Sequence, residues 1–551
     1  MNTLSRRDFI TGGAAAGALA ALSVTAGCAP KASSSADAED AASLAQTGGY
    51  SWENAPEPIA ADAISETREA DVIIIGAGPS GFCAAASAAE NGLSVIMIEK
   101  DAGFNANGGA FFAVNSTYQK SIGYEVDAEA ICHQYLEAMG KKVSQKNVWR
   151  FFDRSGEMAD WFCDIMAGYG MEPVMQGIGY EGDPNNEAMP GTLVLRGGEN
   201  TPTDVTDFDP YTCDLGLGYV PMVDYLNAMT DYITGLGVQV DYETASERIL
   251  REDEGRVTGI VASQGDAYIQ YNAAKGVVIA SGDYGANEEM LEYFCPQAAR
   301  FGSDLMISTM NTGDLHRQAM WVGAAMQKWP DHAPSGFCGD AHPVWNLNVN
   351  KKCERFTNEY TSTSSLSWAI MQQEEGKTYS LFNEKYASQL PYVPGYIGAD
   401  VPTPSQMIGA WDELVEAGAY FKEDTLEALA ADLELDPTAL KKTVDDYNAM
   451  CAAGKDTDFH KPAQFLFALD EPPYYGFKNG VCMLTVHGGL HVDEDSRVLT
   501  ENDEVIEGLF AVGLAAGDFW ANSYTTRFAG ISHGHNMTGG YLVGRYLAGK
   551  E

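Results

Sequence analysis

Basic residues are scarce in this sequence, and the paired cysteines that bind metals or haem do not occur. Only 34 Lys and Arg stand against 77 Asp and Glu, which gives a net charge of −43. Such an acidic chain repels phosphate backbones, so we expect no nucleic-acid partner. None of the ten cysteines belongs to a C-x-x-C or C-x-x-C-H motif, so we expect free thiols, no metal site and no covalent c-type haem.

The residues that are abundant indicate a large α/β enzyme. The chain has 551 residues, enough for more than one domain, and 58 of them are glycine without a collagen-like period. A glycine content above the usual level fits an enzyme whose backbone approaches a ligand closely.

The N-terminus has the pattern of an export signal. Ser5-Arg6-Arg7-Asp8-Phe9-Ile10 precedes an almost uncharged run, rich in alanine and glycine, that extends to Gly27. The pattern resembles a twin-arginine signal, here over residues 1–27. Because this route carries folded proteins, it already suggests a cofactor that is loaded in the cytoplasm.

A lipid anchor is expected directly after the signal. Val24-Thr25-Ala26-Gly27-Cys28 resembles a lipoprotein processing box, although Thr25 stands where a larger aliphatic residue is usual. Lipidation of Cys28 would hold the protein on the outer face of the cytoplasmic membrane, its only contact with the membrane. Residues 28–67 are rich in Ala, Ser, Asp and Glu and predict a flexible tether, with the folded enzyme starting near Arg68.

A complete βαβ unit opens the folded region. A β-branched run from Asp71 to Ile75 leads into Gly76-Ala77-Gly78-Pro79-Ser80-Gly81, a helical pattern over 82–91, and a second strand over 93–98 that ends at Glu99. A G-x-G-x-x-G motif in this place, with an acidic residue after the second strand, is typical of a dinucleotide site.

Each residue type in this motif has a physical role. Gly76 and Gly78 let the backbone approach a pyrophosphate, whose charge is attracted by the helix N-terminus at Ser80. Gly81 allows the helix to pack tightly on the strand. Glu99 would accept hydrogen bonds from the ribose hydroxyls of the adenosine half.

Three further segments resemble the fumarate reductase/succinate dehydrogenase flavoprotein family. Asn105-Ala106-Asn107-Gly108-Gly109-Ala110 resembles the loop that lies along the flavin. The run from Ala274 to Asp283, after a hairpin pattern over 243–262, resembles the strand that ends at the adenine side of FAD. Gly508 to Gly513 resembles the C-terminal FAD strand, with Leu514 in place of the usual glutamate.

The resemblance spans about residues 68–551 and implies both the cofactor and the fold. We expect an α/β protein whose Rossmann-like, glutathione-reductase-like FAD-binding domain comprises 68–323 and 487–551, with an α+β capping domain inserted over 324–486. No histidine lies between Glu99 and Cys132, where some members attach FAD, so the FAD should be noncovalent. The expected FAD contacts are Gly76, Gly78, Ser80, Gly81, Glu99, Lys100, Asn105, Ala106, Gly108, Gly109, Ser281, Gly282, Ile531 and Ser532.

In this family, substrate lies between the flavin and the cap, and a hydride from flavin N5 and a proton from a side chain saturate an activated C=C bond. Such chemistry needs a group that binds the electron-withdrawing carbonyl and a proton donor. Arg527 resembles the family's substrate arginine, because Arg527-Phe528-Ala529-Gly530-Ile531-Ser532 precedes the C-terminal helix as that arginine does. The helix, about 530–547, would point its positive N-terminus at flavin N1 and O2.

The sequence departs from the fumarate reductase pattern at the expected proton donor. Glu354-Arg355-Phe356-Thr357-Asn358-Glu359 resembles a family element, but Thr363 stands where the acid arginine follows. Trp329-Pro330 replaces a histidine before a proline, and the second substrate histidine falls near Thr485. We therefore expect that fumarate is not the physiological substrate.

Two other residues remain candidates for the proton donor. Ser523-Tyr524 resembles an element of flavin-dependent ketosteroid dehydrogenases and enone reductases, a branch in which a tyrosine polarises or protonates a ketone. Tyr524 is equally compatible with a packed aromatic residue. His487, beside Gly488-Gly489, has an intrinsic pKa suited to a proton relay, but a lone histidine is often structural.

The leading hypothesis is an exported FAD-dependent reductase of an activated C=C bond in a small-molecule electron acceptor. There are two alternatives. One is a ketosteroid-type dehydrogenase, which catalyses the reverse reaction; the other is a non-catalytic surface flavoprotein that carries electrons. The electron donor should be a membrane-linked multihaem cytochrome, since the chain has no haem motif and no second G-x-G-x-x-G for a nicotinamide.

Overall fold

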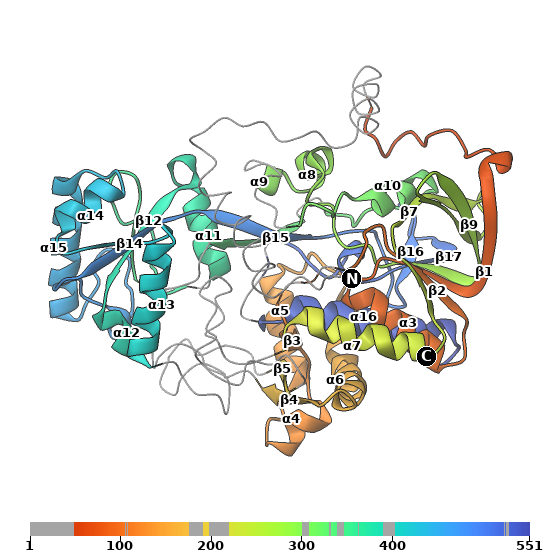
Figure 1. Cartoon of the computed structure of the whole chain (residues 1–551), viewed down its shortest axis with the longest axis horizontal. Helices are drawn as coiled ribbons and strands as arrows, with labels where there is room; N and C mark the ends of the chain where they lie inside the picture. Colours follow the sequence, from red (N-terminus) through yellow and green to blue (C-terminus); the bar gives the residue numbers. More distant parts are fainter. Residues whose placement is uncertain are drawn as a thin grey trace.

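The computed structural model describes residues 49–104, 106, 108–175, 191–197, 220–299, 308–329, 332–338, 346–361, 363–389, 403–522, 524 and 528–551. The chain forms two lobes that are joined by a long strand pair in the middle of the molecule (Figure 1). The first lobe contains both the N-terminal and the C-terminal parts of the described chain. The second lobe, teal and cyan in Figure 1, contains the middle of the sequence.

An eight-stranded sheet forms the centre of the first lobe. Its main path runs in the order β16-β17-β9-β1-β2-β6, and the five strands from β17 to β6 are parallel. The hairpin of β7 and β8 joins it beside β9, antiparallel. The strands are β1 (Ile64–Ile75), β2 (Val95–Ile98), β6 (Gln239–Asp241), β7 (Thr244–Arg251), β8 (Val257–Gln264), β9 (Ala267–Ile279), β16 (Arg497–Leu499) and β17 (Val505–Ala511).

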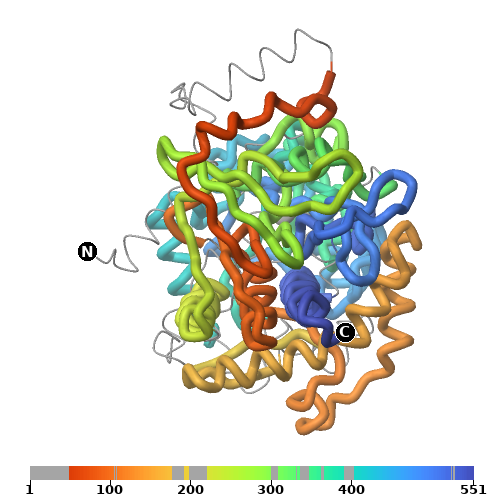
Figure 2. The backbone as a smooth tube through the Cα atoms, turned by 90° about the vertical axis from the view of Figure 1, so that its right-hand side faces the viewer, coloured from red at the N-terminus to blue at the C-terminus, as the bar shows by residue number. Residues whose placement is uncertain are grey.

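The β-branched end of β1 is buried on both faces, which explains its continuous apolar run. Val72 and Ile74 point into a core shared with helices α3, α6, α7 and α16, whereas Ile73 and Ile75 point into a core shared with β7, β8 and β9. Helix α16 lies alongside α3, as the dark blue and orange-red helices of Figure 2 show. The bounds are α3 (Pro79–Glu90), α6 (Gln145–Ala167), α7 (Met222–Gly235) and α16 (Ile531–Leu547).

Smaller elements complete the first lobe. A three-stranded antiparallel sheet has the order β3-β5-β4, with β3 (Phe111–Phe112), β4 (Met171–Met175) and β5 (Thr192–Gly197). The remaining helices are α4 (Thr117–Ser121), α5 (Ala128–Ala138), α8 (Glu288–Phe294), α9 (Pro296–Ala299) and α10 (Asp314–Trp321).

The second lobe is an α+β unit with its own core. Its antiparallel sheet has the order β11-β12-β14-β13, with β11 (Leu347–Val349), β12 (Thr378–Asn383), β13 (Phe421–Glu423) and β14 (Tyr474–Asn479). The helices are α11 (Thr363–Met371), α12 (Lys385–Gln389), α13 (Pro404–Glu416), α14 (Leu426–Asp432) and α15 (Pro437–Ala453). The strand pair β10 (Ala333–Cys338) and β15 (Val481–His487) leads back to the first lobe.

A buried ion cluster stabilises the second lobe at the motif 354–359. The Arg355 guanidinium pairs with Glu359 at 2.8 Å and with Asp456 at 3.0 Å, and all three side chains are almost fully buried. Arg355 also lies over the Tyr447 ring at 5.1 Å. Because each charge has an opposite partner, the cluster can persist away from water, and it fixes the chain that leads into α11.

The folded chain includes residues that we expected in the tether. Strand β1 begins at Ile64, before the expected start near Arg68. The Trp52 ring packs on Phe294 with ring centroids 5.2 Å apart, and the Ser51 amide donates to Glu289 at 3.0 Å. The sequence pattern missed this attachment because its contacts are with α8, far away along the chain. No helix within the described ranges has the length and apolar character needed to cross a membrane.

Candidate active site

The glycine motif forms the turn from β1 into α3. Gly76 has a φ of +108°, and a Cβ on Gly81 would lie 2.0 Å from the Gly76 carbonyl oxygen, so the helix begins directly against the turn. A Cβ on Gly78 would meet only the Ala280 carbonyl oxygen, at 4.0 Å. The outer side of the turn at Gly78 therefore has room for a ligand, and the contact of Gly78 with FAD remains a prediction.

The N-terminus of α3 is suited to an anionic group. The N-cap Gly78 provides no side-chain hydrogen bond and Pro79 occupies the first position. Helix N-termini without a capping side chain attract phosphate through their free N–H groups and the helix dipole. Ser80 is buried at this end, where a Cβ on Gly513 would lie 2.5 Å from its hydroxyl oxygen. These residues fit the pyrophosphate of FAD.

Glu99 lies beside the same turn, where the ribose of a dinucleotide would be bound. Its Oε2 accepts from the Ala77 amide at 2.8 Å and its Oε1 accepts from the Asp101 amide at 3.0 Å. The two bonds fix the carboxylate, and each oxygen keeps a lone pair for a ribose hydroxyl. Lys100 instead donates to Thr312 at 2.9 Å and pairs with Asp314 at 3.1 Å, so its contact with FAD remains a prediction.

The expected flavin loop lies against the start of α16. The Gly108 carbonyl accepts from the Met222 amide at 2.7 Å, and a Cβ on Gly108 would lie 3.6 Å from His533 Nε2. Gly109 is buried, whereas Ala106 is partly exposed. Asn105 lies outside the described residues.

The end of β9 contacts the strand that returns from the second lobe. Ser281 and Gly282 follow β9, and the next residue, Asp283, is buried. Asp283 accepts the hydroxyl hydrogen of Thr485 and the amide of Val486, the latter at 3.2 Å, and burial raises the pKa of this carboxyl. Thr485 stands near the position of the family's second substrate histidine, and here its hydroxyl is engaged by Asp283.

Tyr524, His487 and Ser532 meet at the first turn of α16. The rings of His487 and Tyr524 are stacked, with centroids 4.8 Å apart and an interplanar angle of 12°. His487 Nε2 lies 3.2 Å from the Ser532 hydroxyl, and the Ser532 amide donates to the Tyr524 oxygen. Two candidates that are 37 positions apart in sequence thus share one partner.

The environment keeps both rings neutral. Burial lowers the pKa of His487 to about 3, and the nearby His535 and His533 add to this effect. Nδ1 lies 3.3 Å from the Ala333 carbonyl oxygen, so Nδ1 carries the hydrogen and Nε2 accepts from Ser532. Burial raises the pKa of Tyr524 to about 12, so its hydroxyl is protonated at neutral pH and can donate.

Three expectations about the substrate site have different outcomes. Arg527 lies outside the described residues, so its role remains a prediction. Helix α16 begins at Ile531 after Gly530, which has no side-chain cap, so the N-terminus of this helix can attract an anionic or polar group; that it points at the flavin remains a prediction. Trp329 is 53% exposed, so this residue does not take the place of a buried substrate histidine.

The structure places a further buried histidine near this site that the sequence pattern does not indicate. His332 lies beside Gly488, its Nδ1 shares a hydrogen bond with the Tyr284 hydroxyl, and its ring stacks on Phe294. Burial lowers its pKa to about 3. The only signal in the sequence was a histidine directly before the strand pattern of Ala333–Cys338, three residues after Trp329.

The fold and site define the class: an α/β flavoprotein with a dinucleotide-binding domain and a second, capping lobe. Residues 71–540 match the family described as "FAD binding domain", so the chain belongs to this family and uses FAD. Residues 3–23 match the twin-arginine translocation pathway signal sequence, which supports export by that route. Among the described residues, no three His, Cys, Asp or Glu side chains gather as a metal site would require.

Several proteins of known activity are similar to the chain. It is 24% identical to a vinyl phenol reductase of Lactiplantibacillus plantarum, over 87% of this chain and 96% of the relative. It is 28% identical to a digoxin reductase of Eggerthella lenta, over 93% and 91% respectively. A flavocytochrome c3 fumarate reductase in its open conformation has the same fold, with a TM-score of 0.69, 22% identity, and coverage of 91% of this chain and 82% of that one. The protein is an FAD-dependent oxidoreductase that acts on CH–CH groups.

Proposed function

We propose that this protein is an exported FAD-dependent reductase that saturates an activated C=C bond in a small organic acceptor, an enone or an unsaturated monocarboxylate. The observation that carries the proposal is the meeting of Tyr524, His487 and Ser532 at the N-terminus of α16, next to the glycine loop at Gly108. Bound FAD supplies the hydride. The residues of the chain must bind the acceptor and supply the proton.

Tyr524 is the proposed proton donor. Its hydroxyl is protonated at neutral pH, and the phenolate that remains after transfer is stabilised by the Ser532 amide and the positive end of α16. His487 holds the Ser532 hydroxyl through Nε2 and supports the Tyr524 ring by stacking. The chain thus adds one proton to the substrate carbon that does not receive the hydride.

The residue types at the site favour a substrate with one polar anchor. A dicarboxylate needs cationic or donor groups at both ends, and a chain with a net charge of −43 compensates two carboxylates poorly. Thr363 replaces the acid arginine, Trp329 is exposed, and Thr485 is bound to Asp283. Arg527 alone would then bind a single carbonyl or carboxylate. The vinyl phenol reductase relative also supports a substrate other than a dicarboxylate.

The substrate prediction is tested anaerobically with reduced viologen as electron donor. We expect enones and aryl acrylates to reoxidise the bound flavin and to be turned over faster than fumarate, because they need only one anchor. NADH alone serves as the control donor and should not reduce the flavin. Fumarate as the fastest acceptor, or faster turnover in the reverse direction with an electron-accepting dye, would contradict the proposal.

The proposed electron donor is a membrane-linked multihaem cytochrome, and the proposed location is the outer face of the cytoplasmic membrane. The twin-arginine match supports export, and a lipid on Cys28 would keep the enzyme beside such a donor. This placement also explains why the flavin need not accept electrons from a soluble nicotinamide.

We predict that replacing both Arg6 and Arg7 by lysine leaves the folded holoprotein in the cytoplasm. The reason is that the twin-arginine pair is the recognised part of this signal. Cell fractionation with flavin fluorescence measures the outcome. Cys28→Ser is the matched variant, which should be exported but released from the membrane. Normal export of the double-lysine variant would show that export does not depend on Arg6 and Arg7.

A further inference from the structure

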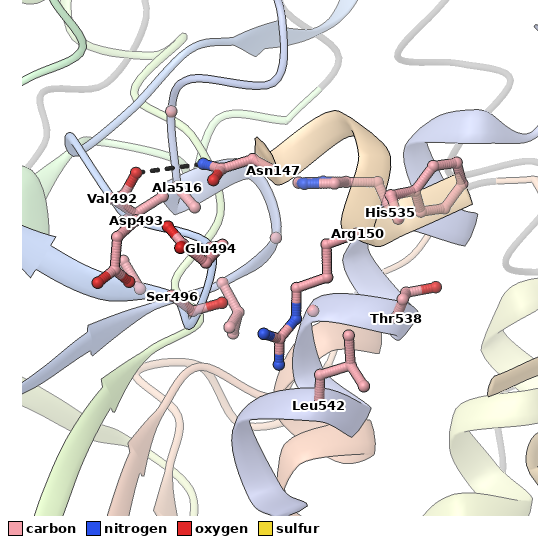
Figure 3. A pocket seen from close by; sticks show the side chains of 16 residues that line it. Asn147, Arg150, Val492, Asp493, Glu494, Ser496, Ala516, His535, Thr538 and Leu542 are labelled. Carbon is pink, nitrogen blue, oxygen red and sulfur yellow. Dashed lines mark hydrogen bonds between the residues drawn. The ribbon is translucent and has the colours of Figure 1, made fainter. Parts of the chain in front are cut away.

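A pocket that opens to solvent lies beside α16, on the side of this helix away from α3. It is enclosed by the first turns of α6, the turn at residues 492–496 and the outer face of α16, as Figure 3 shows. The residues of interest on its wall are Asn147, Arg150, Glu494, Ser496, His535 and Thr538. The Glu494 side chain is 37% exposed, so the rim of the pocket reaches solvent.

The wall of this pocket contains polar atoms that lack partners within the described part of the chain. They are Asn147 Oδ1, His535 Nδ1 and Thr538 Oγ1, and all three are buried. Arg150 is already paired with Asp495 at 2.5 Å. Buried polar atoms are normally hydrogen-bonded, and a pocket with several such atoms in its wall is suited to bind water.

His535 connects this pocket to the catalytic group. It follows Ser532 by three residues on α16, so the two side chains lie on the same side of the helix. The His535 ring stacks on the Phe519 ring, with centroids 4.0 Å apart. The next residue, Trp520, packs on His487, with ring centroids 4.4 Å apart. The two histidines are close enough for the charge of one to lower the pKa of the other.

We propose that this pocket is the proton entrance of the enzyme and that His535 is the relay residue between water and the catalytic group. The inference rests on the proposed function, because a reductase in which Tyr524 gives up a proton must recover one from solvent in each turnover. A pocket water donates a proton to His535 Nδ1, His535 gives up its Nε2 proton toward the Ser532 hydroxyl, and Ser532, which lies beside the Tyr524 oxygen, passes a proton to the Tyr524 phenolate. One proton enters and one leaves in the product, and no electron moves through this path.

The ionisation of His535 is consistent with this role. Burial lowers its pKa to about 4, so the imidazole is neutral at physiological pH. A neutral imidazole has one nitrogen that accepts and one that donates, so it can pass a proton without holding a charge for long. Arg150 could compete with His535 for the pocket water, but its guanidinium is paired with Asp495.

The test compares His535→Ala with the unchanged holoenzyme in the viologen-driven assay. We expect a loss of roughly 10²-fold in kcat, with KM and FAD content unchanged, as for the loss of a proton-transfer group. Added imidazole should restore a large part of the rate, because the open pocket admits it to the place of the missing ring. His133→Ala, which removes an exposed histidine, is the control and should show neither loss nor rescue.

Two results would overturn the inference: a full rate for His535→Ala, or a loss that imidazole does not restore while FAD content is normal.

If His535→Ala loses FAD, Thr538→Val replaces it as the test variant, because this change removes one unpartnered wall atom and leaves the stacked His535 ring in place. A severalfold lower kcat with a larger solvent hydrogen isotope effect is then expected, and unchanged values would overturn the inference. An unimpaired Tyr524→Phe would instead contradict the proposed function.

Discussion

Replacing Gly78 by valine is expected to abolish FAD binding while the protein remains folded. A Cβ at this position meets no protein atom closer than the Ala280 carbonyl oxygen at 4.0 Å, so the chain tolerates the side chain. The same side chain would fill the space that the pyrophosphate needs at the N-terminus of α3. Flavin absorbance of the purified protein, together with its circular dichroism, measures both parts of the prediction.

Two controls make this result specific. Gly81→Ala places a Cβ 2.0 Å from the Gly76 carbonyl oxygen, so we expect it to disturb the turn itself and to lower the stability of the fold. In the unchanged protein, acid precipitation should release the flavin into the supernatant, because no histidine lies in the flavin loop. Full flavin content in a folded Gly78→Val protein would contradict the site, and flavin retained in the pellet would contradict noncovalent binding.

Replacing Tyr524 by phenylalanine is expected to lower the rate of substrate reduction by about 10²–10⁴-fold with FAD still bound, the range for loss of a general acid. Phenylalanine keeps the ring that stacks on His487 and removes only the hydroxyl that accepts from the Ser532 amide. Rapid mixing of reduced enzyme with an enone separates the chemical step from substrate binding.

The matched variant is His487→Gln, which removes the stacked imidazole but retains a side chain able to bond Ser532. If Tyr524 is the acid, the Tyr524→Phe variant should be the slower of the two. An unimpaired Tyr524→Phe enzyme, together with an inactive His487→Gln enzyme, would transfer the proton role to His487.

The parts of the structure that the sequence predicted best depend on neighbours along the chain. The motif Gly76–Gly81 follows a strand and begins a helix as its pattern indicated, and a hairpin lies in the region predicted over 243–262. The C-terminal strand β17 and helix α16 also lie where the resemblance placed them. Local periodicity and turn chemistry determine such units, so a single sequence is sufficient to find them.

The contacts between distant segments could not be predicted in this way. The sequence marks Thr485 only as the position of a missing histidine, and its bond to Asp283 joins residues 202 positions apart. The start of the folded chain was placed too late, because Trp52 has no neighbouring pattern that reveals its packing on Phe294. Nothing in the sequence around His332 indicates its bond to Tyr284.

The sequence by itself determined the cofactor, the export signal and the class of reaction, because glycine spacing, the paired arginines and the family motifs are properties of short continuous segments. Only the tertiary structure decided which of the candidate acids belong together. Tyr524 and His487 acquire their shared partner Ser532, their stacking and their neutral state from burial at the start of α16. Desolvation and mutual orientation depend on the packing of strands and helices far apart in the chain, which no local pattern records.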